Sequence, residues 1–442
     1  MEKYNITTFG CQMNERDSEI ISGILSEFGY ERTDEISEAN LILFNTCCIR
    51  ERAEDKFLSK LGETKHLKYI DPRKKILVCG CMVQQEGASD KIIKSFPHVD
   101  YIFGTHNLHS LADYLKRVPE ENNKSSVDLL PNLSMEKREK LPIKREFPFK
   151  SLINIIYGCN NFCSYCIVPY VRGREKSRNP KKIIKEIKML SAEGVMEIML
   201  LGQNVNSYGK DFNDSKYGFA DLLEDLEKID GIKRIRYMTS HPRDFSPKLI
   251  ETIAKSNKVC KHFHLPLQSG SERILKSMNR GYSKNDYYSL IRSIRQMIPD
   301  AVFTTDIIVG FPGESEAEFA ETLSFLDELR LDSAYTFAYS SRSGTPAAKM
   351  NNQLSTFLKK ERLRILNEKV GEISLEKNQR YLGRIVPVLV EGQSKNNSET
   401  LTGKTDGGKT VIFEGGTELI GRIVNITIEK AQTWILKGTI FK

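Results

Sequence analysis

Cys159-Asn160-Asn161-Phe162-Cys163-Ser164-Tyr165-Cys166 is the stretch that decides the fold and directs the search for a site. Its spacing is C-x3-C-x2-C, and it follows an apolar segment, Leu152–Ile156, that is typical of a buried strand. Thiolates hold iron–sulfur clusters, and three thiolate ligands on a four-iron cluster leave one iron open for a substrate or cofactor. A structural zinc site would need a fourth protein ligand, and the next cysteine along the chain is Cys260. The stretch therefore predicts an iron–sulfur site at the end of a strand.

Six strand candidates lie between residues 151 and 339, and helical stretches separate most of them. They are Leu152–Ile156, Glu197–Leu201, Arg234–Met238, His262–Leu265, Val302–Val309 and Ser333–Tyr339. Asn179-Pro180 begins one helix, as an N-cap followed by proline at the first helical position. Six repeats predict a (β/α)6 barrel, short of the eight repeats of a full TIM barrel. A long helix, Phe357–Tyr381, is expected after the last strand.

Residues 1–118 also alternate between strand and helix. The strand candidates are Tyr4–Phe9, Leu41–Phe44, Ile76–Cys79 and Val99–Phe103, and the first helix is expected over Asn14–Phe28 with Asn14 as its cap. Continuous apolar strands predict a parallel sheet with helices on both faces. Residues 119–147 are polar and charged with little periodicity, which indicates a linker or a draped segment.

The C-terminal residues are rich in β-forming segments. Their strand candidates are Ile385–Val390, Thr410–Phe413, Val424–Ile428 and Thr433–Phe441, separated by glycine pairs. This pattern predicts a small β-barrel related to OB-folds. The expected division is therefore an α/β domain over 1–118, a linker over 119–147, a (β/α)6 core over 148–378 and a β-barrel over 379–442.

A second group of cysteines is scattered through the first domain. Cys11, Cys47 and Cys81 each come just beyond a predicted strand, and the carboxyl ends of parallel strands meet in one crevice. A second cluster and a set of buried apolar cysteines both remain open on this ground. Cys48 is ambiguous because it neighbours a candidate ligand, whereas Cys79 and Cys260 fit the buried interpretation.

Composition restricts the class of protein. The chain has 442 residues, 39% apolar and 28% charged, as expected for a globular protein of two to four domains. Nine cysteines is an odd number, which argues against a disulfide framework. No apolar run is long enough to cross a membrane and the N-terminus shows no secretory signal, so a cytoplasmic protein is expected. The net charge of +8 permits an anionic partner without requiring one.

The C-x3-C-x-aromatic-C loop after the first barrel strand resembles the radical S-adenosylmethionine (SAM) superfamily. Three further motifs, Gly10-Cys11-Gln12-Met13-Asn14, Asn45-Thr46-Cys47 and Gly80-Cys81, resemble the N-terminal domain of methylthiotransferases. The C-terminal module resembles a TRAM domain, which binds RNA. Gly-Cys-Gln-Met-Asn and Thr402-Gly403-Lys404-Thr405 look most like the MiaB type, in which a methylthio group is added to carbon-2 of N(6)-isopentenyl-adenosine at position 37 of tRNA.

This resemblance implies two 4Fe–4S clusters and two SAM molecules. Cys159, Cys163 and Cys166 would hold the radical SAM cluster, and the first-domain group would hold an auxiliary cluster that presents sulfur. The implied partners are the anticodon stem-loop of tRNA and an electron donor such as flavodoxin or ferredoxin, with the enzyme as a monomer and no membrane association. The alternatives are methylthiolation of a ribosomal protein or of threonylcarbamoyl-adenosine in tRNA, and a two-cluster electron carrier without chemistry of its own.

The remaining candidates for cofactor binding are Tyr165, Gln203, Asn204, Gln268 and Asp306. Tyr165 is the aromatic of the cysteine loop, and the others follow or lie in barrel strands, whose carboxyl ends carry chemistry in such enzymes. Structural roles and SAM binding remain equally open for the four strand-associated residues. The stretch Arg172–Lys188 carries a strong positive charge, so contact with RNA phosphates and a solvated helix face are both expected possibilities.

Overall fold

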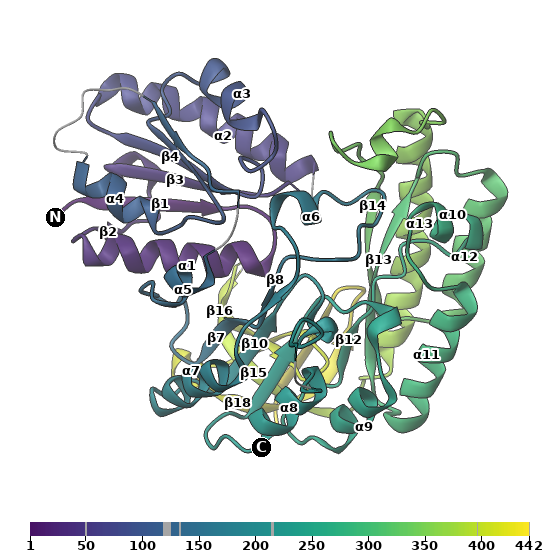
Figure 1. Cartoon of the computed structure of the whole chain (residues 1–442). Helices are drawn as coiled ribbons and strands as arrows, with labels where there is room; N and C mark the ends of the chain where they lie inside the picture. The colour runs from purple at the N-terminus through teal and green to yellow at the C-terminus, as the bar shows by residue number, and fades with distance from the viewer. Residues whose placement is uncertain (49–50, 118–124, 132–133, 214–215, 396, 442) are drawn as a thin grey trace. The chain divides into compact units, whose positions relative to one another are not determined.

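The computed structural model describes residues 1–48, 51–117, 125–131, 134–213, 216–395 and 397–441 (Figure 1). The chain divides into two compact units. The first unit contains Met1–Phe147, Leu152–Phe162 and Cys166–Arg178. The second contains Pro148–Ser151, Cys163–Tyr165 and Asn179–Lys442.

A six-stranded parallel sheet forms the centre of the first unit. Across the sheet the strands are β2 (Glu31–Arg32), β1 (Lys3–Thr8), β3 (Leu41–Thr46), β4 (Lys75–Gly80), β5 (Tyr101–Gly104) and β6 (Ser126–Asp128). The helices are α1 (Gln12–Glu27), α2 (Glu51–Ile70), α3 (Ala88–Ser95), α4 (Ser110–Arg117) and α5 (Met135–Glu139). Ile42 and Phe44 of β3 pack in one core with α2 and α3, whereas Leu41 and Leu43 pack in another with α1 and α4. Helices therefore cover both faces, which confirms the predicted α/β sheet.

The start of α1 differs from the prediction. Cys11 occupies the N-cap position, and Asn14 lies inside the helix, where it is fully buried. Asn14 Nδ2 donates hydrogen bonds of 2.8 Å to the carbonyls of Phe9 and Thr46, so it joins the ends of β1 and β3. The helix begins early because Gly10, at φ +110°, turns the chain directly out of β1.

The segment 119–147 supplies structure to the first unit and is more than a linker. Ser126–Asp128 extends the sheet as β6, and α5 follows it. The guanidinium of Arg138 on α5 is buried and pairs with Asp17 on α1. The polar composition that suggested a linker comes from an edge strand and a short surface helix. Residues 119–124 and 132–133 of this region lie outside the described residues.

The predicted partial barrel belongs mostly to the second unit, although Leu152–Asn154 of its first strand are part of the first unit. The six strands are β7 (Lys150–Asn154), β10 (Glu197–Leu201), β11 (Arg234–Tyr237), β12 (His262–His264), β13 (Val302–Val309) and β14 (Ser333–Ala338). They pair as two three-stranded sheets, β7-β10-β11 and β12-β13-β14, and a parallel bridge between Ile235 and Val259 continues the curve from one to the other. The helices are α7 (Pro180–Ala192), α8 (Phe219–Glu227), α9 (Pro247–Lys255), α10 (Glu272–Ser277), α11 (Lys284–Met297), α12 (Glu316–Leu329) and α13 (Thr356–Gln379). Asn179 caps α7 as expected, its Oδ1 accepting a 2.9 Å hydrogen bond from the Lys181 amide.

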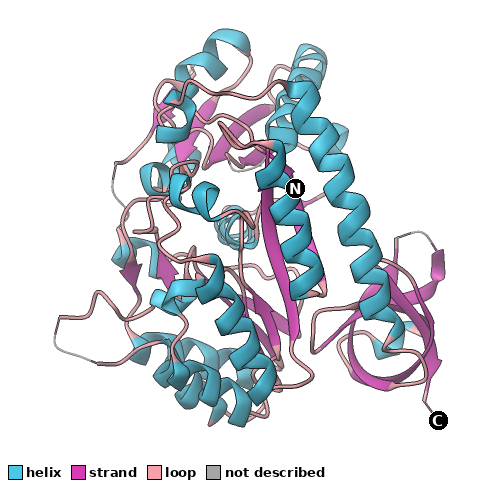
Figure 2. Cartoon of the chain, turned by 90° about the vertical axis from the view of Figure 1, so that its right-hand side faces the viewer, coloured by secondary structure: helices cyan, strands magenta, loops and turns pink. Residues whose placement is uncertain are grey.

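The C-terminal residues form a closed five-stranded barrel beside the end of the long helix α13 (Figure 2). In order around the barrel the strands are β15 (Ile385–Ser394), β16 (Asn397–Thr405), β17 (Thr410–Glu414), β19 (Ile435–Ile440) and β18 (Ile423–Ala431). Valine, leucine, isoleucine and phenylalanine side chains fill its interior. Strand β16 was not among the predicted strands, because its sequence is mostly polar and only Leu401 is an inward-facing large apolar residue.

Two buried arginines on β11 attach this barrel to the strands of the core. Arg234 donates to the carbonyls of Lys404 and Pro387 at 2.9 and 2.8 Å. Arg236 donates to the carbonyls of Asp406 and Thr405 at 2.9 and 2.7 Å and pairs with Glu197 at 2.8 Å. Main-chain acceptors of β15, of the end of β16 and of the turn after it are thus held by fixed cationic donors.

Candidate functional site

Four thiols gather at the carboxyl ends of neighbouring strands in the first unit. Cys11 follows β1, Cys47 and Cys48 follow β3, and Cys81 follows β4. A Cβ atom placed on Gly10 would lie 2.7 Å from Cys47 Sγ, so glycine is needed for this close approach. The Cys48 thiol donates a hydrogen bond to the sulfur of Cys81. The structure therefore brings the three candidate ligands together and adds Cys48 to them.

The electrostatics of this group favour a thiolate at Cys81. The hydrogen bond from Cys48, and then the positive charge of Arg172, lower the pKa of the Cys81 thiol to about 7. Burial raises the pKa of Cys11, and it raises the pKa of Cys79 far more strongly. Cys79 points into the apolar core with α1, as expected for a structural cysteine. Since the thiolate is the form that binds metal, Cys81 is the best prepared ligand of the group.

The arrangement suits a cluster better than a single ion. Within the described part of the chain, no three His, Cys, Asp or Glu side chains are placed to hold one metal ion. In a four-iron cluster each thiolate binds a different iron, so its cysteines need not meet at one point. A donor set made of thiols, with a guanidinium against one sulfur, is the chemistry of an iron–sulfur site and not of a hard cation.

Arg172 was not predicted to belong to this site. Its Nε donates to Cys81 Sγ at 3.1 Å, and its terminal nitrogen donates to Asn14 Oδ1 at 2.7 Å. Arg178, in the same basic stretch, is also buried, and it pairs with Glu139 at 3.0 Å. Both expectations for Arg172–Lys188, phosphate contact and a solvated face, are therefore wrong for these two arginines. The exposed basic residues of the stretch are Arg174, Lys176 and the lysines of α7.

The C-x3-C-x2-C loop runs between β8 (Ile156–Tyr157) and α6 (Val168–Val171). Gly158, at φ +71°, starts the loop, and a Cβ there would lie 2.1 Å from the carbonyl oxygen of Arg174. Cys159, in the first unit, is buried, and its sulfur accepts a 3.5 Å hydrogen bond from the Asn161 amide. Cys163, in the second unit, is also buried, whereas Cys166 is half-buried. Main-chain support of this kind suits a thiolate that holds a cluster.

A buried arginine of the second unit, Arg280, contacts the cysteine loop. One terminal nitrogen donates to Cys163 Sγ at 3.2 Å and to the Tyr165 hydroxyl at 3.4 Å. The ring of Tyr282 lies beneath the guanidinium, 5.2 Å away, and the ring of His241 packs against Tyr282. Burial and then the charge of Arg280 lower the pKa of His241 to about 2, so this imidazole is neutral. No sequence signal marks Arg280, because its partner Cys163 lies 117 residues away.

The two candidates after β10, Asn204 and Gln203, differ in burial and in their contacts. Asn204 is buried and both ends of its amide are occupied: Nδ2 donates to Asp244 at 2.7 Å, and Oδ1 accepts from the His241 amide at 3.1 Å. These bonds tie the loop after β10 to the loop after β11, which is a structural role. Gln203, its neighbour, is partly exposed.

Gln268 stands out among the candidates after β12. It has φ +72°, a conformation that side-chain-bearing residues rarely adopt, and its main chain bridges to Asp306 and Ile308 at 2.8 and 2.9 Å. The side chain is buried, and its Oε1 has no hydrogen-bond partner among the described residues. Thr239, after β11, has φ +66°. Strain and an unsatisfied acceptor at strand ends are typical of a ligand site.

Asp306 faces His264 across neighbouring strands. The distance from His264 Nε2 to an Asp306 carboxylate oxygen is 3.4 Å, and the Asp306 side chain is about a quarter exposed, at 27%. The other imidazole nitrogen of His264 lies 3.0 Å from Thr304 Oγ1. Asp306 thus has a protein partner and retains access to solvent.

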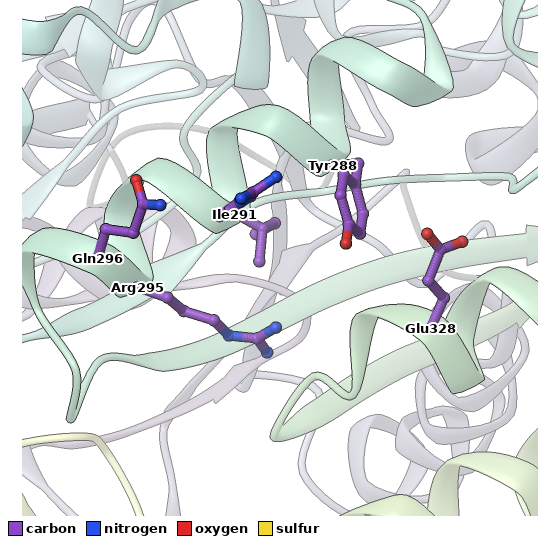
Figure 3. Close-up of a pocket in the computed structure, with 6 residues that line it drawn as sticks. Tyr288, Ile291, Arg295, Gln296 and Glu328 are labelled. Atoms are coloured by element: carbon purple, nitrogen blue, oxygen red, sulfur yellow. The ribbon is translucent and has the colours of Figure 1, made fainter.

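A surface pocket elsewhere in the second unit carries none of this chemistry. It lies between α11 and α12 and is lined by Tyr288, Ile291, Arg292, Arg295, Gln296 and Glu328 (Figure 3). The lining contains no thiol or imidazole. The cysteine-bearing loops therefore remain the candidate reaction site.

Comparisons with known proteins agree with this geometry. Residues 153–326 match the Radical SAM superfamily, residues 3–104 match the uncharacterized protein family UPF0004, and residues 379–441 match the TRAM domain. Among solved structures, a radical S-adenosylmethionine methyltransferase, TsrM, from Kitasatospora setae shares the fold. The TM-score is 0.57 at 14% identity, over 79% of this chain and 77% of that one.

Curated relatives match over nearly the whole chain. A tRNA-2-methylthio-N(6)-dimethylallyladenosine synthase from Pelotomaculum thermopropionicum is 52% identical over 99% of this chain and 97% of its own. The protein of the same name from Bacillus subtilis is 51% identical over 99% of this chain and 85% of its own. The chain therefore belongs to the family of tRNA-2-methylthio-N(6)-dimethylallyladenosine synthases within the radical SAM superfamily.

Proposed function

We propose that this chain adds a methylthio group to carbon-2 of N(6)-isopentenyl-adenosine at position 37 of tRNA, next to the anticodon. The observation that carries the proposal is the presence of two separate cysteine groups in a chain that matches its relatives from end to end. One group follows the first barrel strand, and the other lies at the carboxyl ends of β1, β3 and β4.

Each cysteine group holds one 4Fe–4S cluster in this proposal. Cys159, Cys163 and Cys166 ligate the cluster that takes SAM, and Cys11, Cys47 and Cys81 ligate the auxiliary cluster. When bound, the clusters and SAM supply the radical chemistry and the sulfur transfer that side chains cannot perform. The protein supplies the thiolates and donors to their sulfurs.

The side chains of the second unit orient the cofactor. Gln268 Oε1, buried and unsatisfied, is the best placed acceptor for a SAM amino or hydroxyl group. Tyr165 of the cysteine loop, Gln203 after β10 and Asp306 within β13 contribute further contacts. Asn204 mainly fixes the loop that carries Gln203. The face of α7 and the C-terminal barrel hold the anticodon stem-loop.

The remaining expectations belong to the same proposal. The enzyme works in the cytoplasm as a monomer with a flavodoxin or ferredoxin as electron donor, and its domains divide near residues 147 and 378. Within the described residues, no helix has the length and apolarity to span a membrane. The names of the relatives do not favour action on a ribosomal protein or on threonylcarbamoyl-adenosine, nor simple electron transfer.

Mass spectrometry of tRNA nucleosides from cells that lack the gene tests the substrate. We expect the 2-methylthio derivative of isopentenyl-adenosine to disappear and the isopentenylated precursor to accumulate. Loss of the methylthio group from threonylcarbamoyl-adenosine instead would assign the chain to another branch.

Purified variants test which cysteine group serves SAM cleavage and which serves formation of the methylthio product. A variant with alanine at Cys11, Cys47 and Cys81 should keep about four irons, cleave SAM when reduced and form no methylthio product. Alanine at Cys159, Cys163 and Cys166 should abolish SAM cleavage and leave the auxiliary cluster. Product formation by the first variant would refute the auxiliary role.

A further inference from the structure

Arg280 differs from every other buried arginine in the described part of the chain. The other seven each pair with a carboxylate; they are Arg16, Arg138, Arg172, Arg178, Arg234, Arg236 and Arg362. No carboxylate of the described residues lies within ion-pair distance of Arg280, which is 5% exposed. A guanidinium stays charged in proteins, so Arg280 is a buried positive charge without a countercharge.

The hydrogen-bond partners of Arg280 do not supply the missing charge. Its Nε donates to the Tyr282 hydroxyl at 3.1 Å, and one terminal nitrogen donates to the Pro266 carbonyl at 3.0 Å. The other terminal nitrogen donates to Tyr165 and to Cys163 Sγ. Tyrosine hydroxyls and a carbonyl are neutral acceptors, so among these contacts Cys163 is the one that metal binding converts to an anion.

We propose that Arg280 is a positioning residue that donates its hydrogen bond and its positive charge to the cluster held by Cys159, Cys163 and Cys166. The inference rests on the proposed function, because that function places a cluster on this loop. Thiolate ligation gives such a cluster a net negative charge, and reduction adds another electron. A fixed cation against a ligand sulfur stabilises the reduced form and raises the reduction potential.

Arg172 provides an instructive contrast in the first unit. It also donates to a ligand sulfur, that of Cys81, but it lies 3.6 Å from the carboxylate of Asp17. Asp17 is shared with Arg138. The auxiliary site therefore contains a positive guanidinium and a negative carboxylate, whereas the guanidinium of Arg280 has no carboxylate beside it among the described residues.

The test measures a reduction potential and does not depend on turnover. The full-length chain carries alanine at Cys11, Cys47 and Cys81, so that one cluster remains, and is reconstituted anaerobically. Arg280→Gln removes the charge and Arg280→Lys keeps it. The control is Arg273→Gln, which removes an exposed guanidinium that pairs with the buried carboxylate of Glu318. A redox titration followed by electron paramagnetic resonance gives the midpoint potential of each protein.

At the wild-type midpoint we expect Arg280→Gln to reduce the ratio of reduced to oxidised cluster about tenfold, equivalent to 59 mV for a one-electron couple. Arg280→Lys should remain near wild type, and Arg273→Gln should be unchanged. An Arg280→Gln protein with full iron and an unchanged potential would overturn the inference. Absence of any cluster in the wild-type chain would instead overturn the proposed function.

Thermal unfolding of the iron-free proteins provides a second measurement if Arg280→Gln does not retain iron. A bare buried cation destabilises the empty site, so iron-free Arg280→Met should melt at or above the temperature of the iron-free wild type. An arginine that merely braces the loop through Pro266 predicts a lower melting temperature for this variant. That lower value would also overturn the inference.

Discussion

Three lysines on one face of α7 provide the sharpest test of RNA binding. Lys181, Lys185 and Lys188 are exposed and spaced by four and three residues, so they share a side of the helix. They line a shallow groove with Ile184, Met189 and Ala192. Replacing the three lysines with glutamine removes three positive charges and leaves the apolar part of the groove unchanged.

The size of the effect follows from counterion release. Each phosphate contact contributes roughly 0.7 to 0.9 to the slope of log affinity against log salt, so three contacts contribute about two to three. When the salt concentration rises from 50 to 200 mM, the affinity of both proteins for RNA falls. The factor by which it falls should be about 20- to 40-fold smaller for the triple variant than for wild type, because the removed contacts no longer respond to salt.

The assay is fluorescence anisotropy of an anticodon stem-loop across that salt range. The control replaces three exposed lysines of α2, Lys56, Lys60 and Lys65, with glutamine and makes the same change in net charge. Trp434 is the one tryptophan of the sequence and is exposed on the C-terminal barrel, so its fluorescence reports RNA at that barrel separately. A slope equal to that of wild type would refute phosphate contact by α7.

Three further outcomes are expected. Cys47→Ala should lose about four irons per chain, whereas Cys48→Ala should keep them, because Cys48 acts as a hydrogen-bond donor to Cys81. Iron analysis of the two proteins measures the difference, and equal losses of iron would contradict this prediction. Burial, followed by Arg172 and Arg138, lowers the pKa of His106 from 6.5 to about 4. As the pH falls, the unfolded chain therefore binds the proton before the folded chain does. The free energy of unfolding of the iron-free protein, measured by urea titration, should fall by about 2 kcal/mol between pH 7 and pH 5. This fall should be smaller in His106→Gln and unchanged in the control His66→Gln, whose histidine is exposed. Arg236→Met should lower the free energy of unfolding by about 3–5 kcal/mol, because it leaves Glu197 buried without its partner; a loss below 1 kcal/mol would show that the pair is not a stabilising contact.

Apolar patterning predicted most of the fold. The predicted strands Glu197–Leu201 and Val302–Val309 coincide with β10 and β13, because both segments are rich in apolar residues. Strands β2, β6 and β16 were missed because they are short or polar and depend on pairing with neighbours distant in the sequence. Asn14 was predicted as a cap because its residue type favours that position, whereas tertiary contacts with Phe9 and Thr46 place it inside the helix.

The cysteines of the site were visible in the sequence, but their electrostatic partners were not. Spacing identified the C-x3-C-x2-C loop. Strand ends left a second cluster and buried apolar cysteines both open for Cys11, Cys47 and Cys81, and the family resemblance assigned these three as ligands. Arg172 and Arg280 contact sulfurs 91 and 117 residues away, and a pattern within a short window carries no information on such pairs. Arg172 was misread for a related reason, since a run of basic residues does not show which of its members turn inward.

The joint between β11 and the C-terminal barrel has a consequence for evolution. Arg234 and Arg236 recognise carbonyl oxygens of the main chain, and every residue type presents the same carbonyl. Substitutions on the outer surface of the barrel therefore leave the attachment intact. This surface is free to change in sequence while the module keeps its place on the core.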